Sequence, residues 1–352
     1  MALEKYVFGT LFDKSVSAYR LTNKHGMSVD VCELGATLLS IKIPNGAGSF
    51  DDVICGYDNI DSYYNADGYQ GAIIGRVGNR INKGSFELDG VTYSLYCNDG
   101  ENHLHGGRSG FDKKLWSVLS TDDSDEPSVK LFLLSIDGDE GYPGNLSVTV
   151  TYSLSEDNAL SIRYEAFTDK KTVINLTNHA YFNLAGYSSG KIYDHTLQMD
   201  ADSYLPTTKD LIPTGEIRSV EGTPFDFRFP KKIGRDIKCA NDDLAIAGGY
   251  DHCFNFKGGE TPMPVKRITV SEESTGRKLE VYTNQPCVQF YSGNFLKNKK
   301  YPFRNGCQQT PQMAFCLETQ HMPDAINHPN FTNNVLLPNE KYDYTTIYKF
   351  YY

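Results

Sequence analysis

The feature that most constrains the fold is a pair of neighbouring segments in which apolar and polar residues alternate without a miss. In residues 146–154 every second residue is Leu, Val or Tyr, and in residues 160–166 the alternation continues with Leu, Ile, Tyr and Ala. Between them lies the polar run 155–158 (SEDN). A period of two places one side of each segment in a core and the other in water. The two segments therefore predict an antiparallel strand pair packed on a second layer.

Shorter segments of the same kind occur along the chain. Asp89-Gly90 lies between two runs of period-two patterning, which is a strong signal for a β-hairpin. Residues 29–43 are typical of a strand, a glycine turn and a second strand. Further short strands are expected at residues 195–199, 252–256, 267–270, 279–282, 287–291 and 345–350. Tyr and Phe are abundant and apolar residues at helical spacing are almost absent, which also favours strands.

These patterns predict an all-β protein: one large antiparallel β-sandwich in which residues 1–352 form a single domain. Helices do not alternate with strands, so a parallel α/β sheet is not expected, and no repeat of fixed period occurs. No shift in composition marks a linker. The polar segment 121–128 (TDDSDEPS) is expected to be a solvated hairpin loop, and residues 51–69 a short strand followed by a Tyr-rich loop with one helical turn.

Charge and composition exclude several classes of function. The net charge is -10 and the basic residues are scattered, which argues against nucleic acid and anionic membranes as partners. No apolar run approaches the length of a membrane span, and the first ten residues lack the pattern of a signal peptide, so we expect a cytoplasmic protein. The eight cysteines occur singly, without a C-x-x-C pair, which favours reduced, buried thiols over disulfides or a zinc site.

The segment 315–331 (FCLETQHMPDAINHPNF) is the strongest candidate for a functional region. Apolar strand residues lead to Glu318 at the expected strand end, and polar residues stiffened by Pro323 and Pro329 follow. Binding and catalytic groups collect where strands break into such loops. No Lys or Arg lies within ten residues of Glu318, so no local ion pair occupies it. The alternative is a polar loop with one solvated Glu.

A second cluster, 75–81 (GRVGNRI), carries Arg76, Asn79 and Arg80 among glycines. Glycine permits a close backbone approach, and Arg suits recognition of oxygen atoms. A phosphate-binding P-loop is not expected, because its Lys-Ser/Thr pair and following helix are absent. A purely structural Arg remains an equal alternative.

A third cluster, 98–107 (NDGENHLHGG), places His103 and His105 two residues apart, on the same face of any extended segment. An H-x-H pair can open a metal site, but the carboxylate that such sites need a few residues later is missing from 106–111. Metal binding is therefore not expected.

Two further clusters carry ionisable groups. His179 lies in the strand-like run 175–184 (NLTNHAYFNL), where Asn178 and Tyr181 could fix its tautomer. A lone His in a strand is, however, more often a core residue. The run 248–252 (GGYDH) is expected to be a turn that presents Asp251 beside two rings.

Together the clusters supply a carboxylate base, imidazole acids and polar side chains fitted to hydroxyl groups, without a nucleophile elbow or a dinucleotide fingerprint. At this point the chain resembles the aldose 1-epimerase (galactose mutarotase) family over nearly its whole length. Six motifs occur in the family's order: GRVGNRI, NHLHGG, NLTNHAYFNL, GYDH, VQFYSGN and CLETQHMPDAINHPNF. Gly78 and Ala180 stand where Ala and Ser are common, and residues 297–312 are harder to match, which leaves the shape of that loop open.

The resemblance implies a large β-sandwich with an open cleft and interconversion of the α and β anomers of hexoses such as galactose and glucose, without cofactor or metal. Glu318 would be the general base, His179 the general acid, and His105 would assist. A Glu carboxylate near His179 would favour its charged form, which an acid needs. Hydroxyl groups of the sugar would be held by Asn79, Arg80, Asp251 and Gln289. The partner would be a small sugar, and the chain a monomer or homodimer.

Three rival functions stay open. A glycoside hydrolase needs two carboxylates, and Asp251 is the plausible partner of Glu318. A sugar sensor would keep the cleft and lose the chemistry, although both proton-transfer residues are present. A sugar-phosphate epimerase would need a basic cluster, for which Arg76 beside Arg80 is the only candidate.

Overall fold

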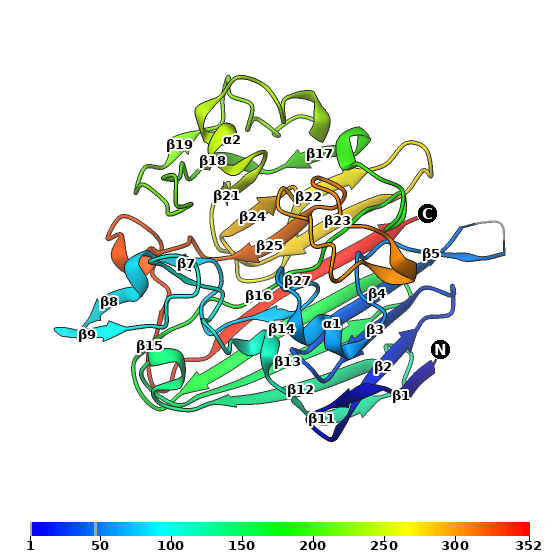
Figure 1. Cartoon of the computed structure of the whole chain (residues 1–352), viewed down its shortest axis with the longest axis horizontal. Helices are drawn as coiled ribbons and strands as arrows, with labels where there is room; N and C mark the ends of the chain where they lie inside the picture. The colour runs from blue at the N-terminus through cyan, green and yellow to red at the C-terminus, as the bar shows by residue number, and fades with distance from the viewer. Residues whose placement is uncertain (1, 46–47) are drawn as a thin grey trace.

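The computed structural model of the protein describes residues 2–45 and 48–352. Its strands form three large antiparallel sheets and several two-stranded ribbons (Figure 1). The α-helices in the described residues are two single short segments, α1 (Ile60–Asn65) and α2 (Asp242–Ala247). The expected all-β antiparallel architecture is confirmed, including the helical turn in residues 51–69. The two ends of the chain lie on the same side of the molecule (Figure 1).

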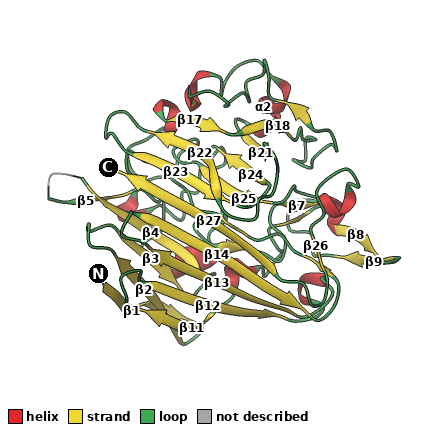
Figure 2. Cartoon of the chain, turned by 180° about the vertical axis from the view of Figure 1, so that it is seen from behind, coloured by secondary structure: helices red, strands yellow, loops and turns green. Residues whose placement is uncertain are grey.

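The largest sheet has nine strands and runs across the molecule in Figure 2. In spatial order its strands are β11 (Ser117–Asp122), β12 (Ser128–Ser135), β13 (Leu146–Leu154), β14 (Ala159–Thr168), β27 (Tyr342–Tyr351), β23 (Lys278–Thr283), β22 (Val265–Ser271), β17 (Thr196–Met199) and β20 (Lys231–Lys232). The strand that ends the chain, β27, thus lies in the middle of this sheet.

Two five-stranded sheets accompany it. The first contains β1 (Ala2–Leu11), β2 (Lys14–Thr22), β3 (Ser28–Cys32), β4 (Thr37–Pro44) and β5 (Phe50–Asp52) in chain order. The second contains β19 (Arg218–Ser219), β18 (Ala201–Tyr204), β21 (Asp251–Phe256), β24 (Cys287–Tyr291) and β25 (Cys316–Gln320) in spatial order.

Four ribbons connect or flank these sheets. They pair β6 (Ile73–Ile74) with β16 (Thr177–Asn178), β7 (Arg80–Ile81) with β10 (His103–Leu104), β8 (Ser85–Leu88) with β9 (Val91–Ser94), and β15 (Thr172–Val173) with β26 (Val335–Leu336).

The patterned segments fold as predicted. Strands β13 and β14 pair from Leu146 opposite Thr168 to Leu154 opposite Leu160, and buried residues alternate along both. Asp89-Gly90 joins β8 to β9, and both residues have the positive φ that such a tight turn requires. The loop between β11 and β12 falls within the predicted segment 121–128.

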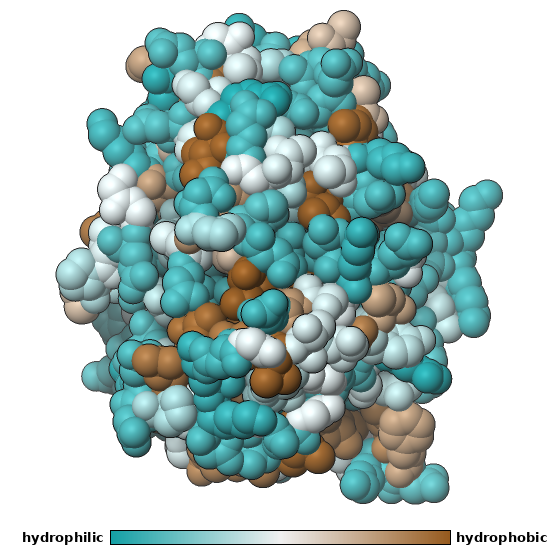
Figure 3. All heavy atoms as spheres, turned by 90° about the vertical axis from the view of Figure 1, so that its left-hand side faces the viewer, coloured by the Kyte–Doolittle hydropathy of each residue, from teal (hydrophilic) through white to brown (hydrophobic). Residues whose placement is uncertain are grey.

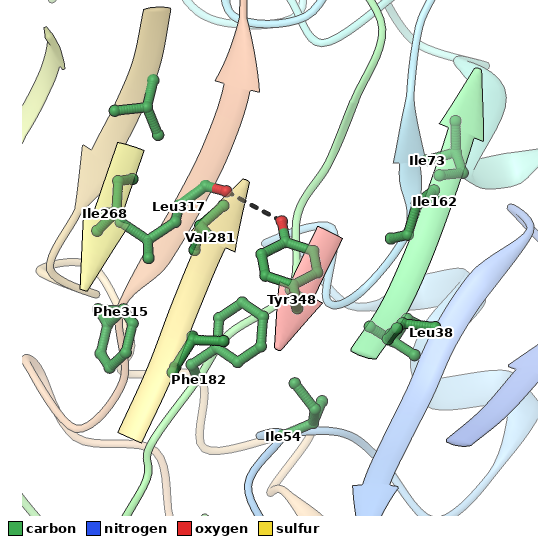
Figure 4. Packing of buried hydrophobic residues seen from close by; sticks show 14 of the residues in the cluster. Leu38, Ile54, Ile73, Ile162, Phe182, Ile268, Val281, Phe315, Leu317 and Tyr348 are labelled. Carbon is green, nitrogen blue, oxygen red and sulfur yellow. Dashed lines mark hydrogen bonds between the residues drawn. The ribbon is translucent and has the colours of Figure 1, made fainter. Parts of the chain in front are cut away.

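The core between the sheets is continuous from the N-terminal sheet to the C-terminal strand and includes Tyr19, Phe182, Leu317 and Phe350. Figure 4 shows the ring of Phe182 beside that of Tyr348 inside it, and the Tyr348 hydroxyl directed at the backbone carbonyl of Leu317. The hydroxyl of Tyr348, on β27, donates a hydrogen bond of 3.1 Å to the carbonyl oxygen of Leu317, on β25. Full burial of a Leu or Phe side chain stabilises a fold by about 1.5–3 kcal/mol. These contacts therefore anchor β25 to the nine-stranded sheet.

Three expectations need correction. Strand β25 continues to Gln320, so Glu318 lies inside a strand and not at its end. The strand in 175–184 is confined to Thr177–Asn178, and His179 follows it directly. The cysteines are unpaired as expected, but Cys97 and Cys239 are exposed, and both lie in loops outside the strands.

The face of the molecule shown in Figure 3 is mostly hydrophilic, with apolar side chains in small separate groups. None of the helices in the described residues is long and apolar enough to cross a lipid bilayer.

Candidate active site

A cleft of about 420 Å³ brings together six of the seven predicted site residues: Asn79, Arg80, His105, His179, Asp251 and Glu318. Its size is that of pockets that bind small molecules. Residues from β25 and β21 form one part of it, and residues at or beside the β7–β10 and β6–β16 ribbons form another. The cleft is thus assembled from segments about 240 residues apart in the chain.

Strand alternation explains how β25 supplies Glu318. Leu317 points into the core, so its neighbour Glu318 projects from the opposite face of the strand, toward the cleft. On the adjacent strand β24, Gln289 lies directly opposite Glu318. The seventh predicted residue, Gln289, lies next to the cleft and its amide donates a hydrogen bond of 2.7 Å to Asp251 Oδ1.

Glu318 and His179 form a close pair. Glu318 Oε1 lies 3.7 Å from His179 Nε2, and the two side chains are only 2 % and 6 % exposed. Glu318 Oε2 has no hydrogen-bond partner among the described residues. Burial raises the pKa of Glu318 well above its usual value, and the negative charge of Asp251 adds to the rise while Arg80 opposes it. This carboxylate is therefore a strong base whenever it is ionised.

The expected charged state of His179 is wrong for the free site. Burial lowers the pKa of its imidazole to about 4, although Glu318 is adjacent. The loss of hydration destabilises the imidazolium, and burial likewise disfavours the carboxylate of Glu318. Burial thus disfavours the charged form of both members of the pair.

The tautomer of His179 is also not fixed by the residues that the sequence suggested. Asn178 donates to the carbonyl of Gly71 and accepts from the backbone of Ala180. Tyr181 stacks on the His179 ring, with centroids 4.9 Å apart and planes at 27°. The atom near Nδ1 is instead Cys316 Sγ, at 3.5 Å.

His105 has a fixed tautomer. The ring Nδ1 of His105 accepts a hydrogen bond of 3.1 Å from the backbone N–H of Asn79. The backbone N–H of His105 in turn donates a hydrogen bond of 2.9 Å to the carbonyl oxygen of Asn79. Both residues have positive φ, 52° for His105 and 59° for Asn79. Because Nδ1 is an acceptor, the ring proton of neutral His105 lies on Nε2. Burial, followed by the nearby His179, lowers the pKa of His105 well below its usual value, so the ring stays neutral.

The side chains of His105, His179 and Glu318 could in principle hold a metal ion, since one ligand atom of each lies within 4.8 Å of the others. A metal-binding imidazole normally donates its second N–H to an acceptor. His105 has the opposite arrangement, because its second nitrogen faces the Asn79 N–H and its Nε2 keeps the proton. The donor set therefore does not fit a metal ion.

In the His103–His105 pair and in the Arg76–Arg80 pair, one residue has a structural role and the other lies in the cleft. His103 and His105 do not share a face, because β10 ends at Leu104 and the His103 ring is held between Tyr96 O and Tyr142 Oη, both at 2.7 Å. The two histidines were expected to share a face, but the positive φ of His105 turns the chain away from the direction of the strand.

Arg76 is buried and structural. It donates to Pro143 O at 2.8 Å and Ser135 Oγ at 2.7 Å, among other backbone and hydroxyl oxygens. Arg80 is half-buried in the cleft wall and pairs with Asp99 at 2.8 Å. A phosphate-binding pair of arginines is therefore not formed.

Several cleft residues could not be found from the sequence. Tyr69 stacks against His179, with ring centroids 6.0 Å apart, and it makes an edge contact with His105, with ring centroids 4.7 Å apart. The loop 297–312, whose shape was open, contributes Lys297 and Gln309 to the cleft. Abundant Tyr signalled stacking faces in general but could not identify Tyr69.

A buried carboxyl group next to an imidazole, in a cleft of this size, is typical of enzymes that transfer protons on small molecules, here built on a β-sandwich. Comparison with known proteins narrows this class to a family. The family model for aldose 1-epimerase matches residues 17–349. A galactose mutarotase from Bos taurus is 44 % identical over 326 residues, covering 92 % of this chain and 91 % of the relative. An aldose 1-epimerase from Escherichia coli K12 is 40 % identical over 333 residues, 94 % of each chain.

The fold agrees with these sequence matches. The crystal structure of a galactose 1-epimerase from Lactobacillus acidophilus superposes with a TM-score of 0.87 at 30 % identity, over 99 % of this chain and 98 % of that one. The chain therefore belongs to the aldose 1-epimerase family of isomerases, which interconvert the anomers of sugars.

Proposed function

We propose that the cleft catalyses interconversion of the α and β anomers of hexoses such as galactose and glucose, with Glu318 as general base and His179 as general acid. The observation that carries the proposal is the buried pair itself, Glu318 Oε1 at 3.7 Å from His179 Nε2 inside the cleft. A positioned acid and a positioned base each contribute about 10²–10⁴-fold in rate. Opening and closing a hemiacetal requires proton transfers alone, so the pair accounts for the chemistry.

The reaction starts with one proton shared by the pair. Transfer of the Glu318 carboxyl proton to His179 Nε2 converts the neutral pair to carboxylate and imidazolium without a proton from solvent. The carboxylate then removes the proton of the anomeric hydroxyl, the bond between the anomeric carbon and the ring oxygen breaks, and His179 Nε2 protonates that oxygen. Rotation of the aldehyde and the reverse transfers close the ring as the other anomer.

The two imidazoles have different roles in this scheme. An imidazolium donates from both nitrogen atoms, and Nδ1 of His105 faces the backbone N–H of Asn79. His105 therefore stays neutral and donates a hydrogen bond from Nε2 to a sugar oxygen. His179 has no N–H group opposite Nδ1 among the described residues, so it is the imidazole that carries the proton.

The remaining predicted residues bind hydroxyl groups. Arg80 and Asn79 contribute from one wall of the cleft, and Asp251, oriented by Gln289, from the other. Buried Gln289 Oε1 has no partner among the described residues and can accept from a hydroxyl. Because the Gln289 amide binds Asp251 Oδ1, we assign this carboxylate to substrate binding and not to the two-carboxylate chemistry of a hydrolase.

We extend the proposal to the whole chain. Residues 1–352 form one domain, since one buried apolar cluster includes residues from Tyr19 to Phe350. The protein works in the cytoplasm, where eight unpaired cysteines stay reduced. A monomer or homodimer is compatible with the cleft, which is complete within one chain.

The test is polarimetry of freshly dissolved α-D-galactose in the presence of a chelator. The wild-type protein should speed relaxation to the unchanged final rotation. Glu318→Gln keeps the shape of the side chain but cannot accept the proton, so its rate should fall to near the uncatalysed value while galactose still binds. Glu87→Gln, at an exposed position on β8, is the matched control and should act as wild type.

Two outcomes would contradict the proposal. Comparable rates for Glu318→Gln and wild type would remove Glu318 from the reaction. Galactose binding by a wild-type protein that leaves relaxation unchanged would identify a sugar sensor.

A further inference from the structure

Cys316 is a buried group in the active site that the proton transfers described above do not use. It lies two residues before Glu318 on β25, so both side chains project from the same face of the strand. Cys316 Sγ lies 3.5 Å from His179 Nδ1, and Glu318 Oε1 lies 3.7 Å from His179 Nε2. One strand therefore contacts both nitrogen atoms of the same imidazole.

The thiol of Cys316 is not suited to nucleophilic chemistry. Its side chain is fully buried in a cluster with Tyr181, Tyr291 and Cys55. Burial raises the pKa of this thiol well above its usual value, and the charge of Glu318 raises it further. Sγ stays protonated and shielded from solvent, which leaves the contact with His179 as its visible role.

A thiol is an appropriate partner for an imidazole that changes protonation. His179 keeps its Nδ1 proton in both the neutral and the imidazolium form of the proposed cycle, and sulfur can accept that proton in both. A backbone N–H, such as the one that faces Nδ1 of His105, permits only the unprotonated state. In the neutral form the ring proton of His179 lies on Nδ1 and points at Sγ, because Sγ is within hydrogen-bond distance of Nδ1, whereas Glu318 Oε1, 3.7 Å from Nε2, is not.

We propose that Cys316 is a positioning residue, whose Sγ accepts the Nδ1–H of His179 and thereby keeps Nε2 directed toward Glu318 and the sugar ring oxygen. The inference rests on the proposed function and deepens it, since it explains what orients the acid. Sγ makes no bond to substrate and loses no proton during the cycle. The ring is held between Sγ on one side and the stacked Tyr181 on its face.

Two substitutions separate the hydrogen bond from the packing. Cys316→Val fills the same space, suits a strand and removes the acceptor. Cys316→Ser restores an acceptor, the hydroxyl oxygen, although its bond to Cβ is shorter than that of the cysteine sulfur. A net hydrogen bond of about 0.5–1.5 kcal/mol corresponds to a change of up to about tenfold. We expect Cys316→Val to lower kcat for α-D-galactose about tenfold with KM within about twofold, and Cys316→Ser to recover part of the loss.

Cys32→Val is the matched control. Cys32 is also a buried strand cysteine, but it packs in the separate cluster around Leu11 and Val16. Its kcat should equal that of wild type. Equal kcat for Cys316→Val and Cys32→Val would overturn the inference, as would a Ser variant no more active than the Val variant.

The direct readout is ¹⁵N NMR of the histidine rings in ¹⁵N-labelled protein. Neutral His179 should carry its proton on Nδ1 and neutral His105 on Nε2, so the two rings should show opposite tautomers. In Cys316→Val the His179 signals should shift toward a tautomer mixture, while those of His105 stay unchanged. His179 and His105 in the same tautomer would overturn the inference.

A failure of the proposed function and a failure of the positioning role give different results. If wild-type protein does not accelerate mutarotation, the proposed function fails whatever the ring tautomers are. If wild type is active and the Cys316 variants match it, the function stands and the positioning role fails.

Discussion

The hydrogen bond between Tyr348 and Leu317 allows a quantitative test of how the catalytic strand is held. Tyr348→Phe keeps the ring in the core and removes the hydroxyl that donates a hydrogen bond of 3.1 Å to the Leu317 carbonyl oxygen. Both residues are about 1 % exposed, so water cannot replace the lost donor. The loss of a buried hydrogen bond that leaves one partner unpaired costs about 1–2 kcal/mol.

This cost converts to a measurable shift. An unfolding entropy of about 2.1 cal/mol/K per residue gives roughly 0.7 kcal/mol/K for 352 residues, so the melting temperature should fall by about 2 °C. Urea unfolding should show a lower midpoint with an unchanged slope. Since the carbonyl of Leu317 begins the peptide unit that carries Glu318, kcat measured by polarimetry should also fall.

Tyr164→Phe is the control for the same chemical change. Tyr164, on β14, is also fully buried in the core, but its hydroxyl has no hydrogen-bond partner among the described residues. Its removal takes away a buried polar group without breaking a bond, so stability should stay within about 0.5 kcal/mol or increase. Equal changes in unfolding free energy for the two variants would refute the reasoning.

The charges around Glu318 predict opposite pH shifts. Asp251 raises the pKa of Glu318 and Arg80 lowers it, so Asp251→Asn should move the alkaline limb of the pH–rate profile to lower pH and Arg80→Gln should move it to higher pH, because ionisation of Glu318 removes the proton that the pair needs; shifts in the same direction would contradict this. The donor set that excludes a metal ion predicts that exhaustive dialysis against a chelator leaves the polarimetric rate unchanged. Lost activity that returns with added Zn²⁺ would show that the site does bind metal.

The strands were accessible to sequence reasoning because their pattern is local. Alternation in 146–154 and 160–166 predicts β13 and β14, and Asp89-Gly90 predicts the hairpin, since each signal involves residues close in the chain. Strand ends were less accessible: β25 continues past Glu318, because Gln320 pairs with Cys287 of the adjacent strand.

The sequence could not show which member of the arginine pair or of the histidine pair lies in the cleft. Arg76 and Arg80 are four residues apart in one motif, yet partners at Ser135 and Pro143 make Arg76 structural. Similarly, Tyr142 binds the His103 ring and leaves His105 for the cleft. Contacts of about 40–70 residues in sequence separation decide these assignments, and no local pattern encodes them.

The charge of His179 shows why proximity alone misled the sequence argument. Proximity to Glu318 favours the imidazolium, but burial disfavours the charged form of each partner, and burial prevails. The same burial makes the charged forms more reactive. An imidazolium with a lowered pKa is a stronger acid than a solvated one, and a carboxylate with a raised pKa is a stronger base. Because one internal proton transfer interconverts the neutral and charged pairs, the site can rest in the stable form and react from the strong one.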